Sequence, residues 1–437
     1  MSFDINTMSK FIIKGGKKLN GAVEIGGYKN AAGAVLAATL LTDQECIIDN
    51  LPLVEDVLNL IKVLESIGAE VSWLGERKIK IRAGGKVDPE KMNYDLINKM
   101  RVSVLLIGPL LARFKHFKIP HPGGDKIGAR SIETHLEALK MLGAEIKSGN
   151  NFYEFSAKNL KNREIVLREF SVTATENLLM AASLIPGKTI IKIAAAEPQV
   201  QDTCAMLKKM GVEIKGTGTH TIEIKGRKNL SGARHTVIPD PLEAGTFIIA
   251  AAAMGGKVEI KNVIVEHLLL FWGKLKDIGV IFELSYTNKS FENQKIANII
   301  VKPARNLKAA KIQALPYPGF PTDLQPMMAV LLTQSEGKSL IHDPLFEARF
   351  GYAEELKKMG ANIEIIDPHR AFVLGPTKLK GAKIASSDIR AGAALVIAAL
   401  IAEGETEISD IHQIDRGYEK IEEKLQKLGA EIRRIKN

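Results

Sequence analysis

The sequence predicts an α/β fold built from six copies of one unit, with helices inside and strands outside. One phrase, Leu-x-x-apolar-Gly followed by Ala, Val or a similar residue, recurs where a helical pattern gives way to a strand pattern. Its six glycines are Gly68, Gly143, Gly211, Gly279, Gly360 and Gly429. They are 75, 68, 68, 81 and 69 residues apart, so units of about 72 residues account for the whole chain.

Two kinds of helix are predicted in each unit. The helix before the repeated glycine is amphipathic, as the spacing of Val57, Leu60, Ile61 and Leu64 shows. Glycine suits its end because it adopts the left-handed backbone conformation at little cost. The other helix is apolar nearly all round, which is typical of a buried helix. This pattern covers residues 31–41, 178–185, 244–253, 327–332 and 391–401.

Short strands with alternating apolar residues flank these helices, for example at 21–25 and 256–260. Strands with one polar face, combined with fully apolar helices, favour helices in the interior and sheets at the surface. Six units divide most simply into three per lobe, with a ligand bound between the lobes.

The composition is that of a soluble globular protein and argues against a nucleic-acid partner. Hydrophobic residues make up 46% of the chain and charged residues 25%. The formal net charge is +10, but the 60 Lys and Arg residues are scattered among 50 Asp and Glu residues. Aromatic residues, which would stack on bases, are only 5%. The positive excess therefore favours a small anionic substrate.

We expect no metal, no cofactor and no contact with a membrane. Cys46 and Cys204 lack a CxxC motif and a nearby His pair, so two reduced, packed thiols are predicted. Residues 1–10 have no long apolar stretch, and no signal peptide or transmembrane helix is predicted. These features favour a cytoplasmic protein.

A loop rich in glycine and charge runs from Pro122 to Arg130. It holds three glycines, the carboxylate of Asp125 and two cations, and it has no apolar periodicity. A helical pattern follows directly, from Ile132 to Leu142. A flexible, charged loop joined to a helix suits a lid over an anionic substrate.

Several cations lie where a strand or loop leads into a helix. Lys29 follows a Gly-Gly-Tyr segment, and backbone amides at such a helix start attract anions. Arg349, Arg390 and Arg416 occupy similar junctions, and Arg101 leads into an apolar run. The alternatives are a solvated lysine at a turn, a surface arginine, and Asp-Arg pairs that are plain surface salt bridges.

Asp323 is the candidate for a general base. It lies in a loop with three prolines, residues 316–325, where a helix is predicted to start. A stiff loop holds a carboxylate in one place, as a general base requires. The alternative is that Asp323 only caps the helix, which is a common role for aspartate.

From about Phe11 to Ile435 the chain resembles the UDP-N-acetylglucosamine 1-carboxyvinyltransferases, which are enolpyruvyl transferases. Seven motifs in the same order carry the resemblance, and together they are highly specific. They are Gly-x-Lys-Asn at 27–30, Pro-Gly-Gly-x-x-Ile-Gly-Ala-Arg at 122–130, Ser-Val-x-Ala-Thr-Glu-Asn at 171–177, Phe-Pro-Thr-Asp at 320–323, Phe-Glu-x-Arg-Phe at 346–350, Asp-x-Arg-Ala at 388–391 and His-x-Ile-Asp-Arg-Gly-Tyr at 412–418.

The resemblance implies a two-lobe inside-out α/β barrel with three units per lobe. Lobe one would comprise residues 1–28 and 239–437, and lobe two residues 29–238 with the mobile loop at 120–131. The implied reaction transfers enolpyruvyl from phosphoenolpyruvate to the 3-hydroxyl of UDP-N-acetylglucosamine and releases phosphate. In the family this reaction needs no cofactor and is the first committed step of peptidoglycan precursor synthesis.

The resemblance also implies a catalytic set and two binding sets. The catalytic residues would be Lys29, Asp125, Asp323 and Arg416, with Asp125 as the acid and Asp323 as the base. The cations around phosphoenolpyruvate would be Lys29, Arg130 and Arg416, with Arg390 nearby, and Arg349 is a further substrate-binding residue. The nucleotide sugar would contact Asn30, Arg101, Arg130, Ser131, Ile132, Glu133, Thr134, Ser171, Val172, Thr173, Asp323 and Leu345.

Three positions depart from the family pattern. Asp125 stands where most members have cysteine. A carboxylic acid with a raised pKa still donates a proton but is a poor target for epoxide alkylation, so we predict an active enzyme that resists fosfomycin. Thr173 replaces a glycine and Pro241 an arginine.

Two alternative functions remain open. One is a sister enolpyruvyl transferase that acts on shikimate 3-phosphate. The other is a non-catalytic paralogue that binds the nucleotide sugar, which the three departures motivate. The presence of Lys29, Asp323, Arg390 and Arg416 argues against a paralogue without activity.

Overall fold

The computed structural model describes residues 9–124, 127–128, 131–292 and 294–436, which form two compact units. Unit 1 comprises the described residues of Met1–Gly26, Asp125–Ala129 and Pro239–Asn437. Unit 2 comprises those of Gly27–Gly124 and Arg130–Ile238. Apart from the short stretch within Asp125–Ala129, the chain therefore belongs to unit 2 from Gly27 to Ile238 and to unit 1 from Pro239 onward.

Unit 1 contains three four-stranded sheets. The first has the order β15 (Ile281–Phe291), β16 (Gln294–Lys302), β14 (Val258–Ile264) and β2 (Gly21–Glu24). The second has the order β17 (Lys311–Gln313), β18 (Gly337–His342), β20 (Arg370–Gly375) and β19 (Asn362–Asp367). The third has the order β21 (Lys383–Ala385), β22 (Glu405–Ser409), β1 (Lys10–Lys14) and β23 (Glu431–Ile435).

Unit 2 also contains three sheets. One has the order β13 (Arg234–Thr236), β3 (Glu45–Asp49), β5 (Lys78–Arg82) and β4 (Glu70–Gly75). Another has the order β11 (Glu213–Lys215), β12 (Thr221–Gly226), β10 (Gly187–Lys192) and β9 (Glu164–Val166). The last, within the described residues, has three strands in the order β6 (His116–Pro120), β8 (Phe152–Ser156) and β7 (Glu145–Ser148).

The sheets repeat one pairing scheme. In the five four-stranded sheets, a single strand pairs in parallel with a neighbour, and the other pairs are antiparallel. In two sheets this strand comes from a distant part of the chain, since β2 pairs with β14 and β13 pairs with β3. Backbone hydrogen bonds thereby join the first and last parts of unit 2 through β3 and β13, and those of unit 1 are joined by the antiparallel pairing of β1 with β22 and β23.

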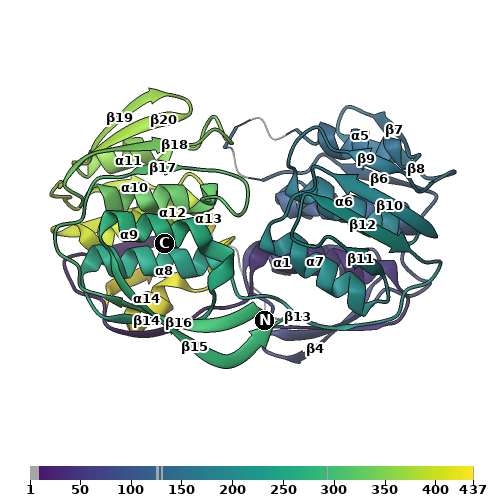
Figure 1. Cartoon of the computed structure of the whole chain (residues 1–437), viewed down its shortest axis with the longest axis horizontal. Helices are drawn as coiled ribbons and strands as arrows, with labels where there is room; N and C mark the ends of the chain where they lie inside the picture. Colours follow the sequence, from purple (N-terminus) through teal and green to yellow (C-terminus); the bar gives the residue numbers. More distant parts are fainter. Residues whose placement is uncertain (1–8, 125–126, 129–130, 293, 437) are drawn as a thin grey trace. The chain divides into compact units, whose positions relative to one another are not determined.

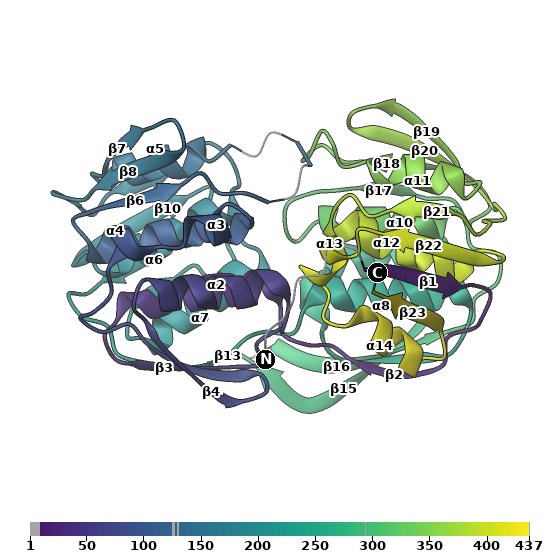
Figure 2. The ribbon, with the colours of Figure 1, turned by 180° about the vertical axis from the view of Figure 1, so that it is seen from behind.

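Each unit holds three buried helices within its sheets, as the two opposite views of the ribbon show (Figure 1, Figure 2). In unit 1 they are α8 (Pro241–Met254), α10 (Gln325–Leu332) and α12 (Ile389–Ile401). In unit 2 they are α1 (Lys29–Ala38), α4 (Ile107–Arg113) and α6 (Val172–Ser183). Most residues of these helices are buried, which confirms the prediction made from the apolar sequences of α1, α6, α8, α10 and α12.

The remaining helices are shorter or amphipathic. They are α2 (Glu55–Ser66), α3 (Tyr94–Ile97), α5 (Glu133–Met141), α7 (Pro198–Lys209), α9 (Leu269–Ile278), α11 (Tyr352–Lys358), α13 (His412–Asp415) and α14 (Ile421–Lys427). The six repeated glycines follow α2, α5, α7, α9, α11 and α14, and all have φ between 91° and 104°. Their predicted left-handed conformation is therefore confirmed.

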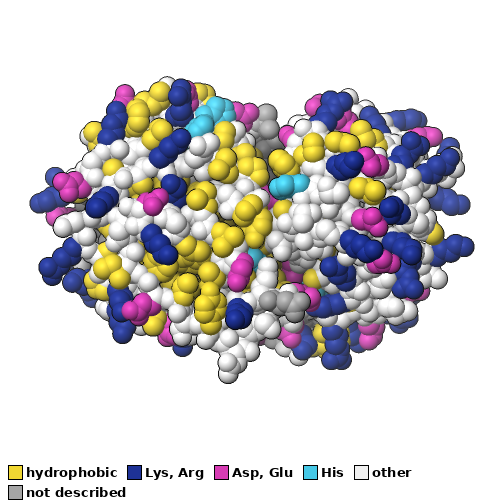
Figure 3. Space-filling model, viewed as in Figure 1, with side chains coloured by type: hydrophobic (Ala, Val, Ile, Leu, Met, Phe, Trp, Pro, Cys, Tyr) yellow, Lys and Arg dark blue, Asp and Glu magenta, His cyan; other side chains and the backbone are white. Residues whose placement is uncertain are grey.

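Charges of both signs are mixed on the surface. Figure 3 shows Lys and Arg beside Asp and Glu over the face of unit 2. Some form cross-strand pairs, such as Lys192 with Glu164 at 2.7 Å and Lys188 with Glu223 at 3.3 Å. Among the helices of the described residues, none has the length and apolar character needed to cross a bilayer.

Close packing of two buried helices in unit 2 depends on a glycine. The amide of Gly108, on α4, donates a hydrogen bond of 2.6 Å to the side-chain oxygen of Asn177 on α6. The Asn177 amide group in turn donates to the Val104 carbonyl at 3.0 Å. A Cβ atom at position 108 would lie 2.4 Å from the Asn177 carbonyl oxygen, so α4 approaches α6 this closely only with glycine there.

The substitution Gly108→Ala should lower the free energy of unfolding by about 1–3 kcal/mol, because the new methyl group forces α4 and α6 apart. Urea unfolding monitored by circular dichroism would measure this. Gly273→Ala is the matched control, since Gly273 is also helical and a Cβ there meets no atom within 4 Å. The control should raise stability by about 0.5–1 kcal/mol; equal stability of the two variants would contradict the packing argument.

Candidate active site

A carboxylate held between two buried guanidinium groups forms the centre of the predicted site in unit 1. Asp323 lies in a 3-10 turn (Thr322–Leu324) directly before α10. Its Oδ1 accepts a hydrogen bond of 2.6 Å from Arg349 Nη2, and its Oδ2 accepts one of 3.1 Å from Arg390 Nε. The two arginine side chains are only 2% and 6% exposed, whereas Asp323 is 27% exposed. A ligand therefore reaches this cluster through the carboxylate.

The charge of Asp323 is fixed by its neighbours. Burial raises the pKa of its carboxyl group, but the positive charges of Arg390 and Arg349 and their hydrogen bonds outweigh burial and hold the pKa at about 2. Asp323 is therefore ionised at neutral pH. A carboxylate stabilised this strongly is a weak base for as long as both arginines bind it.

Helix capping in unit 1 is performed by other aspartates. Asp388 accepts hydrogen bonds from the amides of Arg390 and Ala391, at 2.8 and 3.0 Å, and so caps α12. Asp240 accepts from two amides in the first turn of α8, and burial raises its pKa to about 6 against the opposing charge of Arg390. In contrast, no side chain caps α10, and Asp323 binds arginines instead. The alternative interpretation of Asp323 as a cap is wrong.

The two arginines are fixed from behind. The guanidinium carbon of Arg390 lies 5.3 Å from the centroid of the Tyr418 ring. The buried Tyr418 hydroxyl shares a hydrogen bond of 2.8 Å with Thr246 on α8. Arg349 also donates to the Thr322 carbonyl, at 3.3 Å. Both cations therefore keep their positions relative to α8, α10 and α12.

Leu345 and Arg416 lie on other segments of unit 1. The Leu345 amide donates to Asp343 Oδ1 at 3.0 Å, and Asp343 Oδ2 accepts from the Thr322 hydroxyl at 2.6 Å, next to Asp323. Arg416 follows α13, and its Nη1 donates to Gln413 at 2.8 Å. Asp415 forms two hydrogen bonds of 2.7 Å with Arg434 on β23. Asp415 therefore anchors the segment that carries Arg416 to the edge of a sheet.

Lys29 is the first residue of α1 in unit 2, and it is buried. Its ammonium group lies 2.7 Å from Asp56 Oδ2 in the first turn of α2, with side-chain exposures of 11% and 5%. The alternative of a solvated lysine is wrong. The side chain of the next residue, Asn30, donates to the Tyr28 hydroxyl at 3.1 Å. The start of α1 therefore presents one fixed cation and one fixed amide.

The glycine-rich loop begins against the segment that carries Arg101. A Cβ at Gly123 would lie 1.8 Å from the Asn98 carbonyl oxygen, and one at Gly124, where φ is +122°, would lie 2.7 Å from Arg101 Cβ. Farther along, the Ile127 carbonyl accepts from the Ala348 amide at 3.2 Å. Asp125 and Arg130 lie outside the described residues.

The residues that follow this loop start α5. Arg101 Nη2 donates to the Ser131 carbonyl at 3.2 Å, so this arginine helps to hold the chain where α5 begins. The Ser131 hydroxyl accepts from the amide of Glu133 at 3.0 Å. Ile132, between them, is buried. The hydroxyl of Thr134 donates to Glu169 at 2.7 Å.

The start of α6 holds Ser171, Val172 and Thr173, all partly exposed. The Ser171 side chain does not cap the helix; its carbonyl accepts from the Thr175 hydroxyl at 2.8 Å. Thr173 Oγ1 lies 2.8 Å from Nε2 of His135 on α5. The predicted site residues of unit 2 thus lie at the starts of α1, α5 and α6.

Three residues that sequence analysis did not single out contact predicted site residues. Asp56 binds Lys29, Glu169 binds Thr134, and His135 binds Thr173. Each lies on a different segment from its partner, so no local motif marks it. For Asp56 the sequence did contain a signal. The first turn of α2 is acidic, so one of its carboxylates was available to pair with a nearby cation.

Proline at position 241 fits the structure without strain. Pro241 is the first residue of α8, where a missing N–H is not needed for the helix. Glu243, two residues later, accepts from the Gly26 amide at 3.0 Å and pairs with Lys424 at 2.5 Å. The backbone of unit 1 at the crossing to unit 2 is therefore fixed by Glu243.

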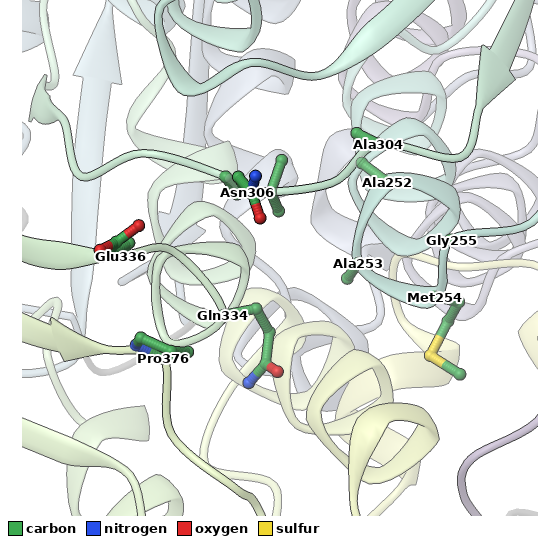
Figure 4. A pocket seen from close by; sticks show the side chains of 10 residues that line it. Ala252, Ala253, Met254, Gly255, Ala304, Asn306, Gln334, Glu336 and Pro376 are labelled. Atoms are coloured by element: carbon green, nitrogen blue, oxygen red, sulfur yellow. The ribbon is translucent and has the colours of Figure 1, made fainter.

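A pocket of about 440 Å³ lies at the other ends of the unit 1 helices (Figure 4). Its walls include the C-terminal end of α8, at Met254 and Gly255, and Gln334 and Glu336 beyond α10. None of the predicted site residues lines it. No group of three or more His, Cys, Asp or Glu residues that could hold a metal occurs in the described part of the chain, and both buried cysteines are free thiols.

Similarity to solved structures supports the fold. The structure matches an enolpyruvyl transferase, NikO, from Streptomyces tendae with a TM-score of 0.88 and 24% identity, covering 99% of this chain and 100% of that one. An EPSP synthase from Acinetobacter baumannii matches with a TM-score of 0.76 and 19% identity, covering 98% and 100%. The described sheets and helices therefore form a known α/β architecture.

Sequence comparison finds relatives with a higher identity to this chain than the two solved structures have. Residues 13–425 match the family model of EPSP synthase (3-phosphoshikimate 1-carboxyvinyltransferase). UDP-N-acetylglucosamine 1-carboxyvinyltransferase 1 from Caldanaerobacter subterraneus subsp. tengcongensis is 46% identical over 428 residues, covering 98% of this chain and 99% of that one. The corresponding protein from Koribacter versatilis is 44% identical over 432 residues, covering 98% and 97%. The chain belongs to the UDP-N-acetylglucosamine 1-carboxyvinyltransferase family, within the wider EPSP synthase family.

Proposed function

We propose that this protein transfers the enolpyruvyl group of phosphoenolpyruvate to the 3-hydroxyl of UDP-N-acetylglucosamine and releases phosphate. The observation that supports this proposal is Asp323, an ionised carboxylate bound by two buried arginines. The chain that contains it is 46% identical to a relative whose name states this transferase activity. The reaction would be the first committed step of peptidoglycan precursor synthesis, and we place it in the cytoplasm. The finer architecture that we propose is an inside-out barrel in each lobe, with three repeats per lobe.

The chemistry requires an acid, a base and several cations. The sugar hydroxyl adds to C2 of phosphoenolpyruvate, an enol phosphate, as C3 gains a proton, which gives a tetrahedral intermediate. Loss of a C3 proton and departure of phosphate then restore the double bond. Phosphoenolpyruvate carries a carboxylate and a phosphate throughout, so fixed cations stabilise every state along this path. Lys29, Arg130, Arg390 and Arg416 are the proposed cations.

Asp323 is the proposed base, and its arginines suggest how its basicity is controlled. In the absence of substrate, Arg349 and Arg390 hold its pKa at about 2. A bound phosphate or carboxylate competes for Arg390 and so weakens the interaction between Arg390 and Asp323. The pKa of Asp323 then rises toward a value at which the carboxylate can accept a proton. Substrate binding would thus activate the base.

Asp125 is the proposed proton donor to C3 of phosphoenolpyruvate. It lies outside the described residues, so this role rests on its position in the Pro122–Arg130 motif. A carboxylic acid performs this step only if its surroundings raise its pKa toward neutrality. Its low nucleophilicity toward an epoxide is the reason that we also propose resistance to fosfomycin.

Shikimate 3-phosphate is the second candidate acceptor, because the family model that matches the chain describes a 3-phosphoshikimate 1-carboxyvinyltransferase. Phosphate release from phosphoenolpyruvate, measured with each acceptor in turn, decides between them. Release with UDP-N-acetylglucosamine alone supports the proposal. Release with shikimate 3-phosphate alone would overturn it, and binding of the nucleotide sugar without release would indicate a non-catalytic paralogue.

The substitution Asp56→Asn should lower the free energy of unfolding by about 3–5 kcal/mol, because it leaves the buried charge of Lys29 without its carboxylate. Thermal and urea unfolding would measure the loss. Glu354→Gln is the control, since it removes an exposed partner of Lys357 and should change stability little. Equal stability of the Asp56 variant and the wild type would show that water already screens the Lys29 charge.

The substitution Asp323→Asn should reduce kcat by about 10²–10⁴-fold, because the amide cannot accept the sugar proton. In the wild type, kcat/KM reports the free enzyme, in which this pKa is about 2. As pH falls from 8 to 5 the carboxylate remains ionised, so Asp323 should contribute no acidic limb in this range. An acidic limb near pH 6 in kcat/KM that disappears in Asp323→Asn would contradict the low pKa of Asp323 in the free enzyme, and an unchanged kcat in Asp323→Asn would contradict its role as the base.

Variants of Asp125 test the proton donor and the drug response together. Asp125→Cys should keep activity and become sensitive to fosfomycin, whereas Asp125→Asn should lose activity because it has no transferable proton. Phosphate release and intact-protein mass spectrometry provide the two measurements. A covalent fosfomycin adduct on Asp125 of the wild-type protein would refute the proposed resistance.

A further inference from the structure

One arginine on the last strand of the chain binds two carboxylates at once. Arg434 lies on β23, and each of its three guanidinium nitrogens donates a hydrogen bond. Nη1 and Nη2 donate to the two oxygens of Asp415, both at 2.7 Å, and Nε donates to Glu422 Oε1 at 2.6 Å. The planar guanidinium group suits such a forked pattern because its donors point in fixed directions. Arg434 therefore fixes both carboxylates in one geometry.

Arg434 is itself held in place by a buried ring. The strand β23 pairs antiparallel with β1, where Phe11 lies opposite Arg434. The guanidinium carbon of Arg434 lies 4.9 Å from the centroid of the Phe11 ring, and Phe11 is fully buried. On its other side β1 pairs with β22, so both residues belong to a continuous sheet. The two carboxylates are thus bound to a fixed group.

The two carboxylates lie at the two ends of the turn that carries Arg416 and Tyr418. Asp415 is the last residue of α13, and Glu422 lies in the first turn of α14. Between them, Lys420 adopts a left-handed conformation with φ of +45°, which is unfavourable for a residue other than glycine. Such a turn keeps its shape only where surrounding contacts restrain it. One guanidinium group provides such a restraint at both ends.

The turn supports two cations of the proposed site. Arg416 belongs to the turn itself. Tyr418 lies behind Arg390, with its ring centroid 5.3 Å from the guanidinium carbon, and its hydroxyl shares a hydrogen bond of 2.8 Å with Thr246. Arg390 in turn donates to the Asp323 carboxylate at 3.1 Å. A displacement of the turn would therefore move Arg416 and weaken the support of Arg390.

We propose that Arg434 is a positioning residue for the phosphoenolpyruvate site. By binding the carboxylates at both ends of the turn, it keeps Arg416 and Tyr418 in the arrangement that the substrate anion requires. This role rests on the proposed function, because it assumes that Arg416 binds phosphoenolpyruvate. Arg434 acts through the turn rather than on the substrate, since its guanidinium nitrogens already bind carboxylates. It also lies outside all seven motifs of the family resemblance.

Steady-state kinetics of the full-length protein test this role. Arg434→Met keeps an unbranched apolar side chain but removes every donor. The KM for phosphoenolpyruvate should rise about tenfold or more, because a small displacement of a substrate-binding group has effects of this size. The Kd of UDP-N-acetylglucosamine, measured by calorimetry, should change little, since most of its proposed contacts belong to unit 2. An unchanged KM for phosphoenolpyruvate in this variant would overturn the role.

Arg433→Met is the matched control. Arg433 precedes Arg434 on β23, so its side chain points to the opposite face of the strand, where it is exposed. The same chemical change there should leave the KM for phosphoenolpyruvate unaltered. An equal rise of KM in the two variants would overturn the role, because it would show a general effect of a lost positive charge on this strand.

A triple variant separates position from stability. Arg434→Met leaves Asp415 and the mostly buried Glu422 without their cation, so it should also lower the melting temperature. Addition of Asp415→Asn and Glu422→Gln removes the unpaired charges. The melting temperature should then recover, whereas the KM for phosphoenolpyruvate should stay raised because the turn still lacks its anchor. The triple variant also provides the test if Arg434→Met alone does not fold.

The outcomes distinguish this inference from the proposed function. Recovery of the KM for phosphoenolpyruvate together with the melting temperature in the triple variant would overturn the positioning role, because Arg434 would then act on stability alone. A wild-type protein that releases no phosphate from phosphoenolpyruvate with UDP-N-acetylglucosamine would overturn the proposed function and this inference together. An active wild type whose Arg434→Met variant has the same KM would overturn only the inference.

Discussion

Two guanidinium groups inside unit 1 need a negative partner, and a single carboxylate supplies it. Arg349 and Arg390 are nearly inaccessible to water, so an unpaired charge on either would destabilise the fold. Asp323 binds both, and it is the member of the cluster that remains partly exposed. The pairing stabilises the interior and also leaves an exchangeable partner at its surface. An anionic substrate can take over one arginine without leaving that cation uncompensated.

Several of the residues that are proposed to bind the substrates lie at the starts of buried helices. Aspartate side chains cap α8 and α12, so the first amides of these helices already have acceptors. Among the buried helices, α1, α4, α6 and α10 start without a side-chain cap. The starts of α1, α6 and α10 carry Lys29, Thr173 and Asp323, which are proposed to meet the two substrates. Among the buried helices, a side-chain cap therefore closes some starts and is absent from others.

The structure gives two of the departures from the family pattern a physical explanation. Seen in the sequence, Thr173 and Pro241 were two losses, of a glycine and of an arginine. In the structure, Thr173 has a buried histidine as its partner, and Pro241 occupies the first position of a helix, which tolerates proline. Neither residue disturbs the local fold, so neither is a sign of a degenerate site.

The sequence by itself determined the left-handed conformation of the six recurring glycines and the identity of five buried helices, because these depend on local periodicity and on backbone conformation. It also placed Asp323 in a loop with three prolines, and Lys29 and Arg390 at helix starts. It did not reveal that Asp56 balances Lys29, that Arg349 and Arg390 share one carboxylate, or that His135 binds Thr173. Those pairs join segments up to 67 residues apart in the chain. Burial of a charge or a polar group forces such a pairing, and only the tertiary structure decides which distant residue provides the partner.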